Sequence, residues 1–311
     1  MRIVIKVGTS TLAHTGGRLN IRRVELLCKV MSDLKNAGHE LLLVTSGAIG
    51  MGVGKLGLPG RPSDMPGKQA CAAVGQCELM YVYDKLFSEY NHNVAQLLLT
   101  ADDIKDPRRS RHVHDNLERL LEFRALPIIN ENDAVATDEI GIETTIGEND
   151  TLSAIVARLV GADTLILLSD IDGLYTADPR KDPAATMIPV VEEITPEILA
   201  LAGGSGSALG SGGMATKLRA AMIATDAGID MVIANGEHPE ALYDIFDGKA
   251  VGTADHIVCK SRDSKDGRFR VRELKEKTLE NAGLPVASGI FQLTCSQTGI
   301  GLPENVAGSR S

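Results

Sequence analysis

The sequence predicts an α/β fold with a mostly parallel central sheet and helices on both faces, an αβα sandwich. Short apolar runs rich in Val, Ile and Leu alternate with longer segments whose apolar residues recur every three or four positions. Strands joined by helices in this way form parallel sheets. The 311 residues are 43% hydrophobic and 23% charged, which supplies a large core and excludes an intrinsically disordered chain.

The elements follow from these patterns. Strands are expected at 3–7, 40–45, 93–99, 126–129, 164–168 and 231–234. Helices are expected at 21–35, 68–89, 111–123, 149–160 and 214–227. Asn20 and Ser110 have the side chains of N-caps, and Gly38 is placed as a C-cap.

Two regions interrupt the alternation. Nine of the eleven residues at 203–213 are Gly or Ser. Near His256 the composition changes, since 260–280 is densely charged with both signs and the rest is almost uncharged. We therefore expect one domain at 1–256, with halves at about 1–165 and 166–256, and a poorly ordered tail at 257–311.

Charge and cysteine content restrict the partners and the compartment. The net charge of −9 argues against binding to nucleic acid or to an anionic membrane, because both would repel the chain at long range. The five cysteines form no CxxC pair, and no signal peptide or membrane span is recognisable. These features favour a reducing compartment and a cytoplasmic location.

Glycine motifs in the first sixty residues do not match the common nucleotide signatures. A P-loop is absent, and the GxGxxG pattern of Gly52, Gly54 and Gly57 follows the second predicted strand instead of the first. We interpret this stretch as an irregular loop. A dinucleotide oxidoreductase is therefore the weakest functional reading.

Small and basic residues follow the first two strands. Lys6 ends the first strand and precedes Gly8 and Thr9, an arrangement that suits an anion site and equally an ordinary solvated lysine. Ser46 and Gly47 repeat the pattern after the second strand, before a helix start. The two strand ends together favour the anion site.

Two polar clusters follow. Asn130 to Asp133 comes directly after an apolar strand, where turn formation alone would need fewer polar residues. Glu148, Asn149 and Asp150 open an apolar helix, where one of them could serve as an N-cap. Both clusters are candidates for ligand binding.

The second half contains two further candidates. Ser169 and Asp170 end a buried strand. The Gly/Ser tract runs into a helix with Lys217 about one turn inside, which is consistent with a flexible linker or with a cradle for a polyphosphate.

Six motifs together resemble the glutamate 5-kinase branch of the amino acid kinase family. They are KVGTS at 6–10, VTSGAIG at 44–50, INENDAVAT at 129–137, GENDTLSA at 147–154, LLSDIDGLYTADPR at 167–180 and GSGGMATK at 210–217. The resemblance covers about residues 1–253 and implies ATP-dependent phosphorylation of the side-chain carboxylate of L-glutamate, for proline synthesis. Other carboxylate or phosphate kinases of this fold, and a non-catalytic amino-acid and nucleotide sensor, are the alternatives.

The resemblance also implies roles for individual residues. The catalytic residues would be Lys6, Asp150 and Lys217. Glutamate would contact Ser46, Asn130, Asp133, Glu148 and Asn149 in the first half. The nucleotide would contact Lys6, Gly8, Thr9, Ser169, Asp170, Ser211, Gly212, Gly213, Met214, Ala215, Thr216 and Lys217. Mg²⁺ would bridge the ATP phosphates, with no metal site made by the protein alone.

Elementary chemistry agrees with this assignment, because a carboxylate nucleophile is already ionised at neutral pH and needs no general base. The chain departs from the family at Glu148, where Asp is expected, and in a longer loop at 138–146, which in the family bears on glutamate binding and inhibition by L-proline. No PUA domain of the RNA-binding type is recognisable after His256. Relatives associate through the kinase domain, which implies a homo-oligomer.

Overall fold

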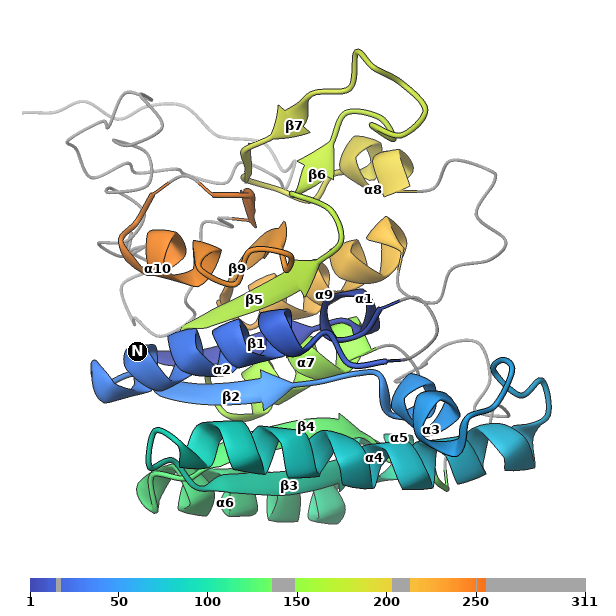
Figure 1. The fold of residues 1–311 in the computed structure, drawn as a ribbon. Coiled ribbons are helices and arrows are strands. Elements are labelled where there is room, and N and C mark those ends of the chain that lie inside the picture. Colours follow the sequence, from blue (N-terminus) through green and yellow to red (C-terminus); the bar gives the residue numbers. More distant parts are fainter. Residues whose placement is uncertain (15–17, 136–148, 203–212, 250, 256–311) are drawn as a thin grey trace, which may run out of the picture.

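The computed structural model describes residues 1–14, 18–135, 149–202, 213–249 and 251–255. Its centre is an eight-stranded sheet with the order β3-β4-β2-β1-β5-β9-β10-β8 (Figure 1). All neighbouring strands are parallel except β9 and β10. In chain order the strands are β1 (Arg2–Val7), β2 (Glu40–Val44), β3 (Val94–Leu99), β4 (Leu126–Glu131), β5 (Thr164–Ser169), β8 (Val190–Val191), β9 (Asp230–Asn235) and β10 (Thr253–Asp255). The predicted α/β class is confirmed.

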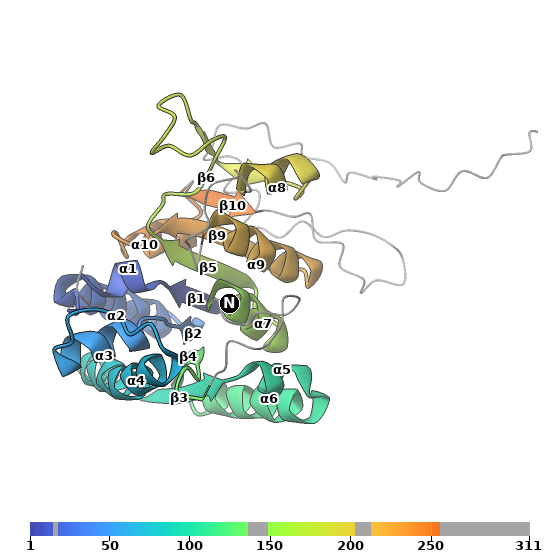
Figure 2. The same ribbon diagram turned by 90° about the vertical axis from the view of Figure 1, so that its right-hand side faces the viewer.

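Helices cover both faces of the sheet (Figure 2). On one face lie α2 (Ile21–Asn36), α4 (Met65–Ser88) and α10 (Ala241–Phe246), which share a hydrophobic core with the sheet. On the other lie α6 (Pro107–Glu122), α7 (Asn149–Leu159) and α9 (Met214–Asp226), which share a second core. None of the helices in the described part of the chain is both long and apolar enough to cross a membrane.

The alternation of β1 decides which face its side chains reach. Ile3, Ile5 and Val7 pack into the core beneath α2 and α4, whereas Val4 packs into the core on the α7 and α9 side. Because alternate side chains of a strand share a face, Lys6 lies on the same face as Val4. The pleat of β1 therefore directs the Lys6 side chain toward α7 and α9.

Helix caps test the expected boundaries. Asn20 accepts a hydrogen bond from the backbone N–H three residues on, so its prediction as the N-cap is confirmed. The C-cap of α2 is Ala37, one residue before the predicted Gly38, which follows it with a φ of +97°. The prediction of Ser110 as an N-cap is wrong, because α6 begins at Pro107 and Asp106 accepts from two N–H groups of its first turn.

The expectation of an irregular loop at the GxGxxG pattern is also wrong. This segment forms α3 (Ala48–Leu56), which packs closely on α4. A Cβ at Gly52 would lie 1.9 Å from the carbonyl oxygen of Cys71, and one at Gly75 would lie 1.8 Å from that of Ala48. These glycines therefore allow two helix backbones to approach, a tertiary requirement that the motif alone does not reveal.

Elements too short to show a period were missed. They are α1 (Thr9–Leu12), α5 (Ala101–Lys105), α8 (Pro196–Ala202), α10, β8, β10 and the two-stranded sheet of β6 (Leu174–Tyr175) and β7 (Met187–Ile188). The tail at 257–311 and most of the Gly/Ser tract lie outside the described residues. The division at about residue 165 stays a prediction, although one sheet runs through both halves.

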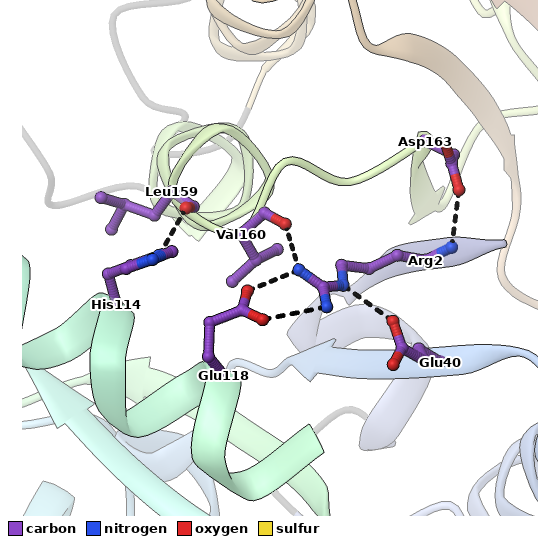
Figure 3. A network of polar contacts seen from close by, with 7 residues as sticks. All are labelled: Arg2, Glu40, His114, Glu118, Leu159, Val160 and Asp163. Carbon is purple, nitrogen blue, oxygen red and sulfur yellow. Dashed lines mark hydrogen bonds and ion pairs between the residues drawn. The ribbon is translucent and has the colours of Figure 1, made fainter. Parts of the chain in front are cut away.

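A polar network joins elements at the amino-terminal edge of the sheet (Figure 3). The Arg2 guanidinium donates to both carboxylate oxygens of Glu118 on α6, to Glu40 on β2 and to the carbonyl of Val160 after α7. The backbone N–H of Arg2 donates to Asp163 at 2.8 Å. The side chain of Arg2 thereby holds the start of β1 against three neighbouring segments.

Candidate functional site

A cleft of about 420 Å³ lies at the carboxyl ends of β1, β2, β4 and β5. Parallel strands bring their carboxyl ends to one edge, which is where open α/β sheets bind ligands. Sequence-predicted residues that line the cleft are Lys6, Gly8, Thr9, Ser46, Asp133, Asn149, Asp150, Ser169, Asp170 and Lys217. The fold thus gathers residues from six separate segments into one site.

Two lysines and one carboxylate form the centre of this site. Lys6 Nζ lies 2.6 Å from one oxygen of Asp150, and Lys217 Nζ lies 3.1 Å from the other. Thr216 Oγ1 donates to the second oxygen at 2.8 Å. Asp150 is 1% exposed, Lys217 4% and Lys6 8%. The group is therefore a buried ionic cluster at the floor of an open cleft.

Secondary structure brings these three side chains together. Lys6 comes from the end of β1, Asp150 from the first turn of α7 and Lys217 from the first turn of α9. The two helices pack against each other, so their first turns carry the carboxylate and the second lysine to the same point. The amino-terminal ends of helices also favour anions.

The pKa values of Lys6 and Asp150 both lie below their ordinary values, for different reasons. Burial lowers the pKa of Lys6 and Lys217 lowers it further, against the opposing effect of Asp150. Burial alone would raise the pKa of Asp150, but the two lysines outweigh it and the pKa lies below its ordinary value. The single carboxylate of Asp150 thus faces two lysine ammonium groups. The cluster therefore carries a net positive charge, which favours binding of an anion.

Backbone groups of two loops surround the same point. A Cβ at Gly8 would lie 3.5 Å from Lys6 Nζ, and one at Gly47 would lie 3.6 Å from Thr9 Cγ2. Gly47 has a φ of +96°, which a residue with a side chain rarely adopts. Glycines here let main-chain N–H groups approach a ligand beside the lysine.

The other end of the cleft carries amide and carboxylate groups. Asn149 Nδ2 donates to Ser46 Oγ at 2.9 Å, while Asn149 Oδ1 is buried without a hydrogen-bond partner among the described residues. Burial raises the pKa of Asp133, and the Arg61 cation partly opposes that shift. A ligand with both an amine and a carboxylate would find partners of each sign here.

Asn130 occupies a different position from its neighbours in the motif. It is 1% exposed and lies beneath the cleft, outside its lining. Its Nδ2 donates to Gln76 Oε1 at 2.9 Å, and its Oδ1 accepts from the backbone N–H of Glu131 at 2.9 Å. Its predicted contact with substrate is untested, and the geometry shows both ends of the amide engaged with the protein.

The nucleotide candidates are only partly described. Ser169 donates to Asp170 at 3.2 Å, and Arg180 pairs with the same carboxylate at 3.0 Å. Burial would raise the pKa of Asp170, but these hydrogen bonds, that of Arg180 foremost, lower it. Gly213 is the N-cap of α9, and Met214, Ala215 and Thr216 form its start. The remaining site candidates Ser211, Gly212 and Glu148 lie outside the described residues.

Sequence reasoning missed two charged residues of the lining, Arg61 and Glu131. Glu131 belongs to a polar cluster that was recognised, so its position after β4 could have been used. Arg61 precedes α4 in a loop that follows no strand, and the sequence gives no signal that the loop reaches the cleft.

Comparison with known proteins agrees with the motifs and the fold. The model of the amino acid kinase family matches residues 1–235. The chain is 55% identical to a glutamate 5-kinase of Clostridium perfringens over 252 residues, which cover 81% of this chain and 94% of that protein. It is 53% identical to a glutamate 5-kinase of Listeria innocua, over 81% of this chain and 91% of that one.

Solved structures show the same fold at low sequence identity. Carbamate kinase from Giardia lamblia bound to AMP-PNP matches with a TM-score of 0.57 and 19% identity, over 82% of this chain and 97% of that one. A product complex of isopentenyl phosphate kinase from T. acidophilum matches with a TM-score of 0.56 and 18% identity, over 82% and 100%. Together with the closer relatives, these matches show that the chain belongs to the amino acid kinase family, in its glutamate 5-kinase branch.

Proposed function

We propose that this protein transfers the γ-phosphoryl group of ATP to the side-chain carboxylate of L-glutamate. The product is L-glutamyl 5-phosphate, and the reaction begins proline biosynthesis. The observation that carries the proposal is the pair Lys6 and Lys217 on the two oxygens of Asp150, at the floor of a cleft lined by Asp133 and Asn149. The identity to glutamate 5-kinases supports the choice of acceptor.

The lysine pair serves phosphoryl transfer. Nucleophile and phosphate are both anionic, so the reaction needs its repulsion neutralised and the transferring oxygens held in place. Lys6 and Lys217 approach from β1 and α9 and would hold the transferring group between them. Asp150 positions both ammonium groups before ATP binds, so little reorganisation is needed at the moment of reaction.

The acceptor side binds and orients glutamate. Its side-chain carboxylate is the nucleophile and is ionised at neutral pH, so no residue has to remove a proton. Asp133 would pair with the α-ammonium group, and the Asn149 amide, held by Ser46, would fix the position of the substrate. Glu148 belongs to the same proposal by resemblance.

ATP would contact residues from both halves of the chain. Gly8 and Thr9 would donate to the phosphates, and Ser169, Asp170 and residues 211–217 would contact the rest of ATP. Among the described residues no three His, Cys, Asp or Glu side chains gather as metal ligands, and Asp150 and Asp170 are engaged by cations. In this proposal Mg²⁺ enters as part of the nucleotide substrate.

A trapping assay tests the activity. Purified protein is incubated with ATP, Mg²⁺ and hydroxylamine in separate reactions, each of which contains one acid: L-glutamate, L-aspartate or N-acetyl-L-glutamate. Hydroxylamine attacks the acyl phosphate and releases phosphate, and the hydroxamate that forms is measured as its coloured iron(III) complex. Hydroxamate with glutamate alone is expected. Its absence with glutamate refutes the proposal, and formation with another acid instead indicates a different kinase of this fold.

Resemblance to the family supports three further proposals. These are feedback inhibition by L-proline, a homo-oligomer formed through the kinase domain, and a cytoplasmic location. The described cysteines Cys28, Cys71 and Cys77 are free thiols, which is compatible with a reducing compartment. Activity measured against proline concentration, and light scattering after gel filtration, test the first two.

A further inference from the structure

Two buried amides and one exposed amide form a hydrogen-bonded series that runs from β4 through α4 to β3. Asn130 Nδ2 donates to Gln76 Oε1 at 2.9 Å, and Gln76 Nε2 donates to Gln96 Oε1 at 3.0 Å. Asn130 is 1% exposed and Gln76 is 8% exposed. Gln96 ends the chain at an exposed position on the edge strand. The connection thus links a buried residue at the end of β4 to the surface.

The contact between Asn130 and the backbone of Glu131 sets the direction of every hydrogen bond in this series of amides. The backbone N–H of Glu131 can only donate, so Asn130 must turn its oxygen toward it, as observed at 2.9 Å. The Asn130 amide nitrogen then faces Gln76, which must present its own oxygen. A reversed Gln76 amide would set nitrogen against nitrogen at Asn130 and oxygen against oxygen at Gln96. Only one arrangement satisfies all three side chains.

This series of amides reaches the substrate end of the cleft through the end of β4. Glu131 and Asp133 line the cleft, and the Asn130 side chain is hydrogen-bonded to the backbone of Glu131, the last residue of β4 before the turn that carries Asp133. Asn130 itself lies beneath the lining. Its amide can therefore determine where Asp133 stands without contacting the substrate.

We infer that Gln76 is a positioning residue for glutamate binding, which acts by orienting the Asn130 amide and through it the turn that carries Asp133. The inference rests on the proposed function. It also gives Asn130 a supporting role beneath the site. No part of the chain of amides contacts the lysine cluster, so its effect is confined to the acceptor substrate.

The Gln76→Leu variant breaks the chain at its centre with a side chain of similar size. It leaves the buried Asn130 nitrogen without its acceptor, so Asn130 is free to turn away from Glu131. We expect KM for glutamate to rise about tenfold, with KM for ATP changed less than about twofold. Gln76→Glu keeps an acceptor for Asn130 and is expected to restore most of the affinity. Gln96→Leu removes only the exposed end and serves as the matched control, with KM for glutamate close to that of the unmodified protein.

Independent readouts separate positioning from a general structural effect. Thermal melting of each variant shows whether it is folded. If Gln76→Leu does not fold, Gln76→Asn takes its place and is compared with Gln76→Glu. The shorter Asn side chain does not reach Asn130. The double variant Gln76→Leu with Asn130→Ala should be no worse in KM for glutamate than Asn130→Ala alone. An unchanged KM for glutamate in Gln76→Leu, equal rises for both substrates, or failure of the Glu variant to restore binding would overturn the inference. If the unmodified protein itself phosphorylates no glutamate, the proposed function has failed first.

Discussion

Replacing Asp150 by Asn removes the negative charge shared by the two lysines and keeps the shape of the side chain. The carboxylate is 1% exposed and lies 2.6 Å from Lys6 and 3.1 Å from Lys217. The single carbonyl oxygen of Asn can accept from one ammonium group, while its NH₂ group faces the other. One buried lysine therefore loses its counter-ion.

The size of the effect follows from that loss. Breaking a buried ion pair by removing one partner costs ~3–5 kcal/mol. The cleft allows water to reach the cluster, so we expect the lower end of this range, about 3 kcal/mol in the free energy of unfolding at neutral pH. Turnover should fall at least ~10²-fold, as for removal of one transition-state donor.

The loss of stability should depend on pH. Burial already lowers the pKa of Lys6 and Asp150 opposes that shift, so the Asn variant has an even lower folded-state pKa. Below that pKa the lysine is charged in both states and the full penalty applies. As the pH rises from the folded-state pKa toward the ordinary lysine value, the native lysine loses its proton and the penalty shrinks. The difference from the unmodified protein is therefore largest near neutral pH and smaller in alkaline buffer.

Urea unfolding at neutral and alkaline pH measures these differences. Asp170→Asn is the matched control for stability, since its carboxylate lies in the same cleft but pairs with the exposed Arg180 and should cost under ~1 kcal/mol. A variant of Asp150 as stable as the unmodified protein, with turnover within about fivefold, would refute the idea that this carboxylate holds the lysines in place.

Four other expectations rest on single side chains. Lys217→Ala should reduce kcat by at least ~10²-fold while circular dichroism shows a folded protein, and near-normal activity would contradict its role at the phosphate. Arg2→Ala should lower the free energy of unfolding by about 1 to 2 kcal/mol with kcat unchanged, because it removes ion pairs to the partly exposed Glu118 and Glu40 and takes a donor from the carbonyl of the buried Val160; chemical denaturation measures this, and a change under about 0.5 kcal/mol speaks against the network. Arg61→Gln removes the cation that opposes the raised pKa of Asp133, so the acid limb of kcat/KM for glutamate should move to higher pH, whereas a shift to lower pH would show that the charge acts elsewhere. Gly75→Ala should destabilise the protein by ~1–3 kcal/mol, because its Cβ would lie 1.8 Å from a carbonyl oxygen of α3; an unchanged melting temperature would show that the helices can separate freely.

The predictable part of the site consisted of residues at the carboxyl ends of strands. Lys6, Ser46 and Asp133 each follow an apolar run, and parallel strands place such residues at one edge. The same reasoning could not distinguish Asn130, which belongs to the same motif as Asp133 but points beneath the cleft. The difference arises from its contact with Gln76, a residue 54 positions away on another element.

The cleft also contains a residue that no local signal identifies. Arg61 lies in a loop between two helices, and only the packing of α3 on α4 carries that loop to the substrate end. Gly52 and Gly75 permit this packing, and Gly52 also belongs to the GxGxxG pattern that resembles a nucleotide-binding signature. Sequence spacing alone could not show that their function is contact between helix backbones.

By itself, the sequence determined the fold class, the major strands and helices, and the identity of the groups that carry charge at the strand ends, because these depend on periodicity and residue type over short distances. The tertiary structure decided which of these groups meet. Lys6 and Lys217 are separated by 211 positions, as their numbers show, and yet they share the oxygens of Asp150, because the pleat of β1 and the crossing of α7 and α9 direct all three inward. Burial lowers the pKa of Lys6, and the two neighbouring lysines lower that of Asp150 against the effect of burial; no local pattern contains either shift.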